Sequence, residues 1–331
     1  MHIERIDPLD LDLDTADALA EVATASEAGD GLDFAPKTGP DVLTSRQLGF
    51  DSRPLDALFV AFDGDRVVGE ADVELPWRDN LDQAGVRGRV HPDARRHGIG
   101  RDLWEHSVAF AREHGRTRLS TGAWHGTGGF DVLTGWGLSR TGTGVIRRID
   151  VHATPASTWD RLYDEGLARA GDYEITRQVG STPADQVEAM VALHTAINDA
   201  PSTDPDDEPS RWDAARLADY EGAMAGRRQT LYRVVARHRG TGEPAGHSLL
   251  AFNEFFPTAA FQEDTAVVRA HRGHRLGLLM KATMLAWVSD LRPELATIDT
   301  WNDATNHHMI AINERLGATK VATYQGFRAD L

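Results

Sequence analysis

Two short segments rich in arginine, histidine and glycine have the composition of an anion-binding turn. The first is VHPDARRHGIG, residues 90–100, and the second is VVRAHRGHRLG, residues 267–277. Each follows an apolar, strand-like stretch and precedes apolar residues at helical spacing. A helix that opens on such a turn has free N–H groups and a positive dipole end, which together bind phosphate. We therefore expect both segments to hold a phosphate-bearing ligand, with their arginines adding positive charge.

The two segments are copies of each other, because residue n of the first falls on residue n + 177 of the second. At the same offset Gly69 falls on Gly246, and TGAW (121–124) finds a counterpart in DTWN (299–302), one residue out of step. Three features in the same order indicate an internal repeat. We predict two domains, residues 1–152 and 153–331.

Each half has the pattern of an α/β domain. In the first half, residues 58–62 read as a strand, residues 69–75 as an alternating strand, and residues 99–114 as an amphipathic helix followed by a strand at 117–124. The second half repeats this order. The predicted fold is two tandem domains, each a mixed, mostly antiparallel twisted sheet with a central strand–turn–helix unit.

The first turn resembles the acetyl-CoA signature of the GNAT acyltransferase superfamily, V-x-P-x-x-R/Q-x-x-G-x-G/A. Neither copy has the lysine and Ser/Thr of a Walker loop or the GxGxxG of a dinucleotide fold. The order of elements also resembles this superfamily over most of both halves, in the tandem layout of mycothiol synthase-type members. The resemblance implies acetyl-CoA as co-substrate, with its pyrophosphate on the backbone of the turn and its pantetheine arm beside Val90 and Val267.

The remaining cofactor contacts are also implied by the resemblance. In the second half, TWNDATNHHMIAINERLGA (300–318) is similar to the family's last motif, and its asparagines would face the pantetheine or acetyl end. The implied cofactor-binding residues are Val90, Arg95, Arg96, His97, Gly98, Ile99, Gly100, Arg101, Val267, Arg272, Gly273, His274, Arg275, Leu276, Gly277, Asn302, Asn306 and Asn313.

Each copy departs from the family pattern in one place. Arg275 takes the place of a glycine, where it could obstruct the ligand or pair with a CoA phosphate. The first half has no counterpart of Asn302 and Asn306. It could bind CoA structurally or be degenerate, and the second half is the better candidate for catalysis.

Glu263 and Asp264 are the candidate catalytic bases, because family members use a carboxylate on the central strand to take the proton of the amine. Adjacent strand residues point to opposite faces, so only one of them should face the ligand. Glu263 shares its face with Val267, whereas a bulge would favour Asp264. Both could instead only solvate the strand end. Asn313 stands where many members have a tyrosine that serves as the general acid for the leaving thiolate. Tyr324 and His307 lie nearby in sequence as other candidates for this role.

Composition limits the class of protein. The net charge of −16 argues against nucleic-acid binding, and the lack of cysteine favours a cytoplasmic protein. No apolar run approaches the ~20 residues of a membrane span. No histidine pair with a third ligand is evident, so no metal is expected. The acidic segment 199–213 reads as a solvated loop or as a substrate-recruiting one.

These patterns favour an acetyl-CoA-dependent N-acetyltransferase for a small-molecule amine, and the acidic balance leans weakly towards a cationic one. Two alternatives stay open: a CoA-binding sensor without catalysis, and an acyltransferase for a longer acyl-CoA or a protein acceptor. We expect a monomer or a homodimer.

Overall fold

A computed structural model describes residues 1–201, 204 and 206–331. The chain divides into two compact units. The first unit holds residues 1–144, 204, 206–209 and 322–331, and the second holds the described residues of 145–201 and 210–321. Strands β6 (Ser139–Asp150) and β12 (Thr319–Asp330) each begin in one unit and end in the other. The division thus falls a few residues before the predicted 152, and the last strand of the chain completes the first unit.

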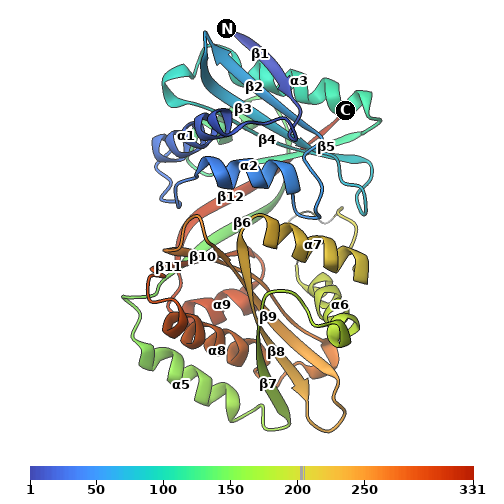
Figure 1. Ribbon diagram of the computed structural model, residues 1–331, viewed down its shortest axis with the longest axis vertical. Helices are drawn as coiled ribbons and strands as arrows, with labels where there is room; N and C mark the ends of the chain where they lie inside the picture. Colours follow the sequence, from blue (N-terminus) through green and yellow to red (C-terminus); the bar gives the residue numbers. More distant parts are fainter. Residues whose placement is uncertain (202–203, 205) are drawn as a thin grey trace. The chain divides into compact units, whose positions relative to one another are not determined.

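The first unit is a sheet with helices on both faces. Its strand order is β1-β2-β3-β4-β5-β12. β4 and β5 are parallel, and the other neighbours are antiparallel. Helices α1 and α2 cover one face and α3 the other (Figure 1). The bounds are β1 (His2–Ile6), α1 (Leu13–Gly29), α2 (Gly39–Leu48), β2 (Ala57–Asp63), β3 (Arg66–Glu74), β4 (Gln83–Val90), α3 (Ile99–Glu113), β5 (Arg118–Trp124) and α4 (Gly128–Gly135).

The second unit repeats this plan, with strand order β6-β11-β10-β9-β8-β7. β10 and β11 are parallel, whereas β9 pairs antiparallel with both β10 and β8. Helices α5, α8 and α9 lie on one face and α6 and α7 on the other (Figure 1). The bounds are α5 (Ala156–Leu167), β7 (Tyr173–Val179), α6 (Val187–Thr195), α7 (Ala214–Gly226), β8 (Gln229–His238), β9 (Pro244–Asn253), β10 (Ala259–Val267), α8 (Leu276–Leu291), β11 (Thr297–Asp303) and α9 (His307–Arg315). The predicted α/β fold class is confirmed.

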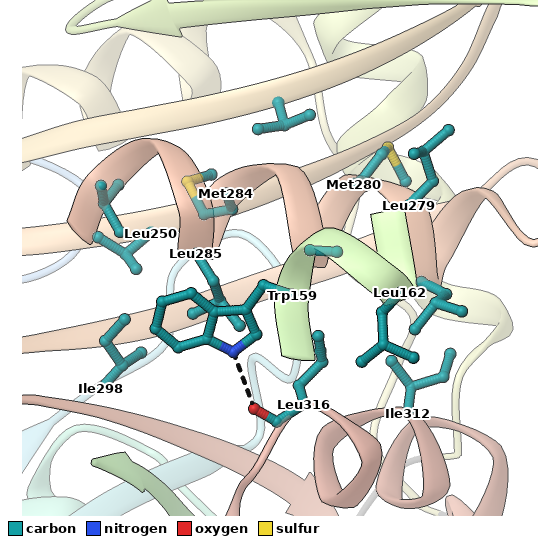
Figure 2. Packing of buried hydrophobic residues seen from close by; sticks show 14 of the residues in the cluster. Trp159, Leu162, Leu250, Leu279, Met280, Met284, Leu285, Ile298, Ile312 and Leu316 are labelled. Atoms are coloured by element: carbon teal, nitrogen blue, oxygen red, sulfur yellow. Dashed lines mark hydrogen bonds between the residues drawn. The ribbon is translucent and has the colours of Figure 1, made fainter. Parts of the chain in front are cut away.

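Helix α8 is buried on nearly all sides because α5 packs over it. Gly166 of α5 permits this approach, since a Cβ atom there would lie 2.8 Å from the Leu279 Cβ. Figure 2 shows Trp159 of α5 among Leu285, Ile298 and Leu316. Its indole N–H donates to the Leu316 carbonyl at 3.1 Å, so the ring is buried with its polar atom satisfied. This core holds the helix that opens on the second turn.

Candidate active site

In both units the two central parallel strands pair at first and then separate. β4 pairs with β5 over residues 83–85 only, and β10 pairs with β11 over residues 259–262. The described ladders give residues 86–90 and 263–267 no partner on that side. An extended ligand can therefore pair with the free backbone groups of these segments.

The turn after each strand has the same backbone shape but a different residue pattern. Two positions of the turn, separated by one residue, have a left-handed backbone in both copies. In the first they are Arg96 (φ +69°) and Gly98 (φ +88°), and in the second Gly273 (φ +89°) and Arg275 (φ +56°). Each copy thus uses one glycine and one arginine, in opposite order. A left-handed residue other than glycine costs about 1–2 kcal/mol, which the turn tolerates once.

The backbone amides of both turns are free. Within the described residues, no N–H of residues 96–100 or 273–277 donates to a backbone carbonyl. Helices α3 and α8 begin at Ile99 and Leu276, which are buried and anchor the helix starts. Each turn therefore presents a row of donors at a positive helix end, which suits a pyrophosphate.

Arg95 and Arg272 brace the turns. The Arg95 Nε donates to the Val90 carbonyl at 3.1 Å, and its guanidinium pairs with Asp30 at 2.7 Å. The Arg272 Nε donates to the Val267 carbonyl at 3.2 Å, and its guanidinium pairs with Asp199 at 2.7 Å. The expected positive charge of these two arginines is therefore balanced within the protein.

Asp30 and Asp199 were missed by sequence reasoning. Asp30 caps the end of α1, and Asp199 ends the short 3-10 helix Ala196–Asp199 that follows α6. One sequence signal could have identified them: in both copies an acidic residue follows a helical segment that lies before the signature.

Arg275 forms an ion pair within the protein. Its guanidinium pairs with Glu165 of α5, and the same carboxylate accepts a bond from Arg315 of α9 at 2.5 Å. Four further predicted cofactor-binding residues are exposed: Arg96, His97, Arg101 and His274.

The asparagines of the last motif have structural partners. The Asn313 amide, fully buried, donates to Asn302 Oδ1 at 2.8 Å. Asn306 caps α9 by accepting a bond from the Met309 N–H at 3.2 Å. Tyr324 belongs to the first unit, where its ring packs on Trp124 at 5.1 Å, and His307 is exposed at the start of α9.

A β-bulge brings Glu263 and Asp264 to the same face of the sheet. Gln262 pairs with Leu250 but Thr265 pairs with Ser248, so two residues of β10 oppose one of β9. Strand alternation then places Glu263 with Phe261, and Asp264 with Ala266, on the face covered by α6 and α7. The expectation that the two carboxylates point to opposite faces is wrong, because it assumed a regular strand.

The two carboxylates lie in a poorly solvated environment that makes them effective proton acceptors near neutral pH. Burial, and then the neighbouring Asp264 charge, raise the pKa of Glu263 to about 7. Burial raises the pKa of Asp264 to about 6. The Asp264 side chain still exposes 36% of its surface, so it remains accessible to a ligand. The Arg227 guanidinium acts in the opposite direction on the pKa of Glu263, but among the described residues no lysine or arginine forms an ion pair with either carboxylate.

The equivalent face of the first unit is closed by ion pairs. β4 has no bulge, and Val86 and Arg87 stand at the positions of Glu263 and Asp264. Glu70 and Asp72 of β3 are buried there and pair with Arg46 of α2 at 3.0 and 2.9 Å. Arg87 adds a longer pair to Asp72 at 3.7 Å. Among the described residues of this copy, no carboxylate on that face lacks a cationic partner.

The described middle part of the acidic segment, residues 204 and 206–209, belongs to the first unit and is bonded to it. Asp206 pairs with Arg328, and Asp207 accepts a bond from Gln83 at 2.8 Å. Ser202, Thr203 and Pro205 lie outside the described residues. The predicted solvated loop is therefore anchored in its described part.

The described residues contain neither a metal-binding cluster nor a membrane-spanning helix. No group of three or more His, Cys, Asp or Glu side chains there could hold a metal ion. None of the described helices is long and apolar enough to cross a membrane.

Comparison with known proteins agrees with this geometry. The model of the acetyltransferase (GNAT) family matches residues 30–125, in the copy whose turn carries the full signature. No curated protein sequence matches the chain. A tandem GNAT protein from the clavulanic acid biosynthesis pathway is 26% identical, with 99% of this chain and 98% of that one covered and a TM-score of 0.81.

More distant structures share the fold. A GCN5-related N-acetyltransferase from Sphaerobacter thermophilus is 18% identical, with 99% of this chain and 95% of that one covered and a TM-score of 0.67. A putative acetyltransferase from Pyrococcus horikoshii is 12% identical, with 100% and 89% covered and a TM-score of 0.59. Residues 30–125 thus form an acetyltransferase domain of the GNAT family, and the whole chain has the two-domain fold of a tandem GNAT protein.

Proposed function

We propose that the chain transfers the acetyl group of acetyl-CoA directly to a primary amine of a small molecule, and that the second unit carries out the reaction. The observation that carries this proposal is the bulge in β10, which puts two carboxylates without cationic partners beside a free strand edge and a free anion-binding turn. The first unit has the edge and the turn but not the carboxylates.

The residues of the second unit fit acetyl-CoA. The free amides of residues 273–277 would hold the pyrophosphate, and the unpaired edge of residues 263–267 would pair with the amides of the pantetheine arm. Acetyl-CoA supplies the electrophilic thioester when it is bound. The protein's task is to orient the amine and to remove its proton.

Asp264 is the better proton acceptor of the two. An amine attacks only after it loses a proton from its ammonium form, so the base must be ionised at the working pH. With pKa values of about 6 and about 7, Asp264 and Glu263 are both mostly ionised at pH 7.5, Asp264 more completely, and the Asp264 side chain is accessible to the amine. In the transfer an ammonium N–H bond breaks and an Asp264 O–H bond forms. The amine nitrogen then bonds to the acetyl carbon while the thioester C–S bond breaks, and the second nitrogen proton ends on the departing thiolate to give the free CoA thiol. Glu263 contributes negative charge that favours binding of the ammonium.

The test is thiol release from acetyl-CoA in the presence of a panel of amines that includes polyamines, amino acids and aminoglycosides. We expect at least one amine to release thiol well above the rate without acceptor, and mass spectrometry to find the acetylated amine. Longer acyl-CoAs and peptide amines form the comparison arms. Acetyl-CoA binding without thiol release in any arm would contradict the proposal and would leave a binding protein.

A further inference from the structure

His194 of α6 is a buried imidazole placed directly behind Asp264. Its Nδ1 lies 3.9 Å from Asp264 Oδ2, and its side chain exposes 1% of its surface. Neither ring nitrogen has a hydrogen-bond partner among the described residues. Buried polar groups are almost always paired, so this imidazole needs an explanation.

Packing fixes the plane of the His194 ring. The ring stacks on Trp212 with centroids 4.3 Å apart and 25° between planes. His247 of β9 and Tyr220 of α7 meet it edge-on at 4.8 and 5.9 Å. The buried ring is enclosed by these contacts. Two polar groups lie beside it: the Asp264 carboxylate at 3.9 Å, and the His247 imidazole, whose nitrogens also have no hydrogen-bond partner among the described residues. Of these, the carboxylate is the stronger acceptor.

Burial, more than the neighbouring charges, keeps His194 neutral. Burial, and then the Arg233 guanidinium, lower the pKa of His194 to about 3. Arg233 of β8 is itself paired with Glu221 at 2.7 Å. The other titratable groups around this pair are Glu263 and Tyr220, which interact with Asp264, His247 of β9, which interacts with His194, and Arg227 at the end of α7, which interacts with Glu263. A neutral imidazole has one N–H to donate, and an ionised carboxylate is the strongest acceptor nearby.

We propose that His194 is a positioning residue for Asp264: its Nδ1–H donates to the carboxylate, which orients the base and favours its ionised form. A rotation of the half-exposed Asp264 side chain shortens the present separation to a hydrogen bond, as such contacts often do when ligand binds. His194 keeps its proton throughout, while Asp264 gains the proton lost by the ammonium. The catalytic consequence rests on the proposed function, but the hydrogen bond itself does not.

The first unit supplies an internal comparison. At the matching positions it has Arg87 for Asp264 and Glu70 for His247, and those two residues belong to the ion-pair network with Arg46 and Asp72. The neighbouring imidazoles of His194 and His247 are therefore present only in the copy that has the carboxylates. A role in packing alone would give no reason for this restriction.

The test compares His194→Asn with His194→Leu. The Asn amide nitrogen can occupy the place of Nδ1 and keep the donor, whereas Leu removes it. The primary measurement is the pKa of Asp264. It is obtained from carboxyl ¹³C NMR of the full chain labelled at aspartate, with the Asp264 signal assigned by its loss in Asp264→Asn. We expect the pKa to rise by about one unit in His194→Leu and to change by less than about a third of that in His194→Asn.

Activity is the second measurement. We expect kcat to fall about tenfold or more in His194→Leu, with KM for acetyl-CoA unchanged, and to recover in His194→Asn. His194→Gln, which is polar but lacks a donor at the Nδ1 position, should behave like His194→Leu and replaces it if that variant does not fold.

The proposal is overturned if the Asp264 pKa is the same in all variants, or if His194→Asn behaves like His194→Leu. A wild-type protein that acetylates no amine would refute the proposed function instead. The NMR titration would still decide the role of His194.

Discussion

Gly98 and Arg275 occupy the same position of the duplicated turn and share the same left-handed backbone, with φ of +88° and +56°. Each is the residue that immediately precedes the signature helix. The turn is therefore specified by its place between strand and helix and not by glycine at this position. Arg275 adopts the left-handed backbone conformation at a position where the family pattern has a glycine.

This relationship predicts different responses to substitution at the two positions. Gly98→Ala should lower the free energy of unfolding by about 1 kcal/mol, because alanine is strained at this φ. Arg275→Gly should change it by less than that, since relief of strain is offset by the greater freedom of glycine in the unfolded chain. The exposed pair with Glu165 adds little. Urea unfolding measures both, and a larger loss in Arg275→Gly would contradict the account.

Gly69 and Gly246 face the signature helices and form a second matched pair. A Cβ atom at Gly246 would lie 2.8 Å from the Ala266 carbonyl oxygen and 3.0 Å from the Met280 Cε. At Gly69 the nearest atom, the Arg89 carbonyl oxygen, is 3.1 Å away. Gly246→Ala should therefore cost about 1–3 kcal/mol of stability, and Gly69→Ala less. The reverse order in thermal or urea unfolding would show that the helix position adjusts more freely than described.

Arg46 holds the closed face of the first unit. Its side chain is 12% exposed and neutralises two buried carboxylates. Arg46→Met should cost roughly 3–5 kcal/mol, because both charges would lose their close partner. The control is Arg87→Met, since Arg87 is 58% exposed and lies 3.7 Å from Asp72. It should cost less than about 1 kcal/mol. Similar losses in the two variants would mean that the network is not organised around Arg46.

Glu263 should make stability fall as pH rises. Its pKa is raised from 4.5 to about 7, so between these values the folded chain binds the proton more tightly than the unfolded chain does. The unfolding free energy therefore decreases through this window. Glu263→Gln should match the wild type near pH 4 and exceed it above pH 7, by of order 1 kcal/mol. Unfolding at a series of pH values gives this difference, and a gain that shrinks with rising pH would show the opposite shift.

Local patterns in the sequence predicted much of this structure. The repeat, the strand–turn–helix units and the placement of the turns followed from residue types at short spacing. The bulge at Glu263 and Asp264 did not, because a bulge depends on the register with β9. The brace of Arg272 by Asp199 and the approach of His194 to Asp264 also depend on helix α6 packing against the sheet, which local sequence does not encode.

The central claim is that the second unit acetylates and the first does not. The most direct measurement is kcat for thiol release in Asp264→Asn and in the matched variant Arg87→Asn, with acetyl-CoA affinity measured in parallel. We predict that Asp264→Asn lowers kcat by a factor of about 10² or more while acetyl-CoA affinity is retained, and that Arg87→Asn keeps kcat within about twofold. Full activity in Asp264→Asn, with loss in Arg87→Asn, would contradict the account and move the reaction to the first unit.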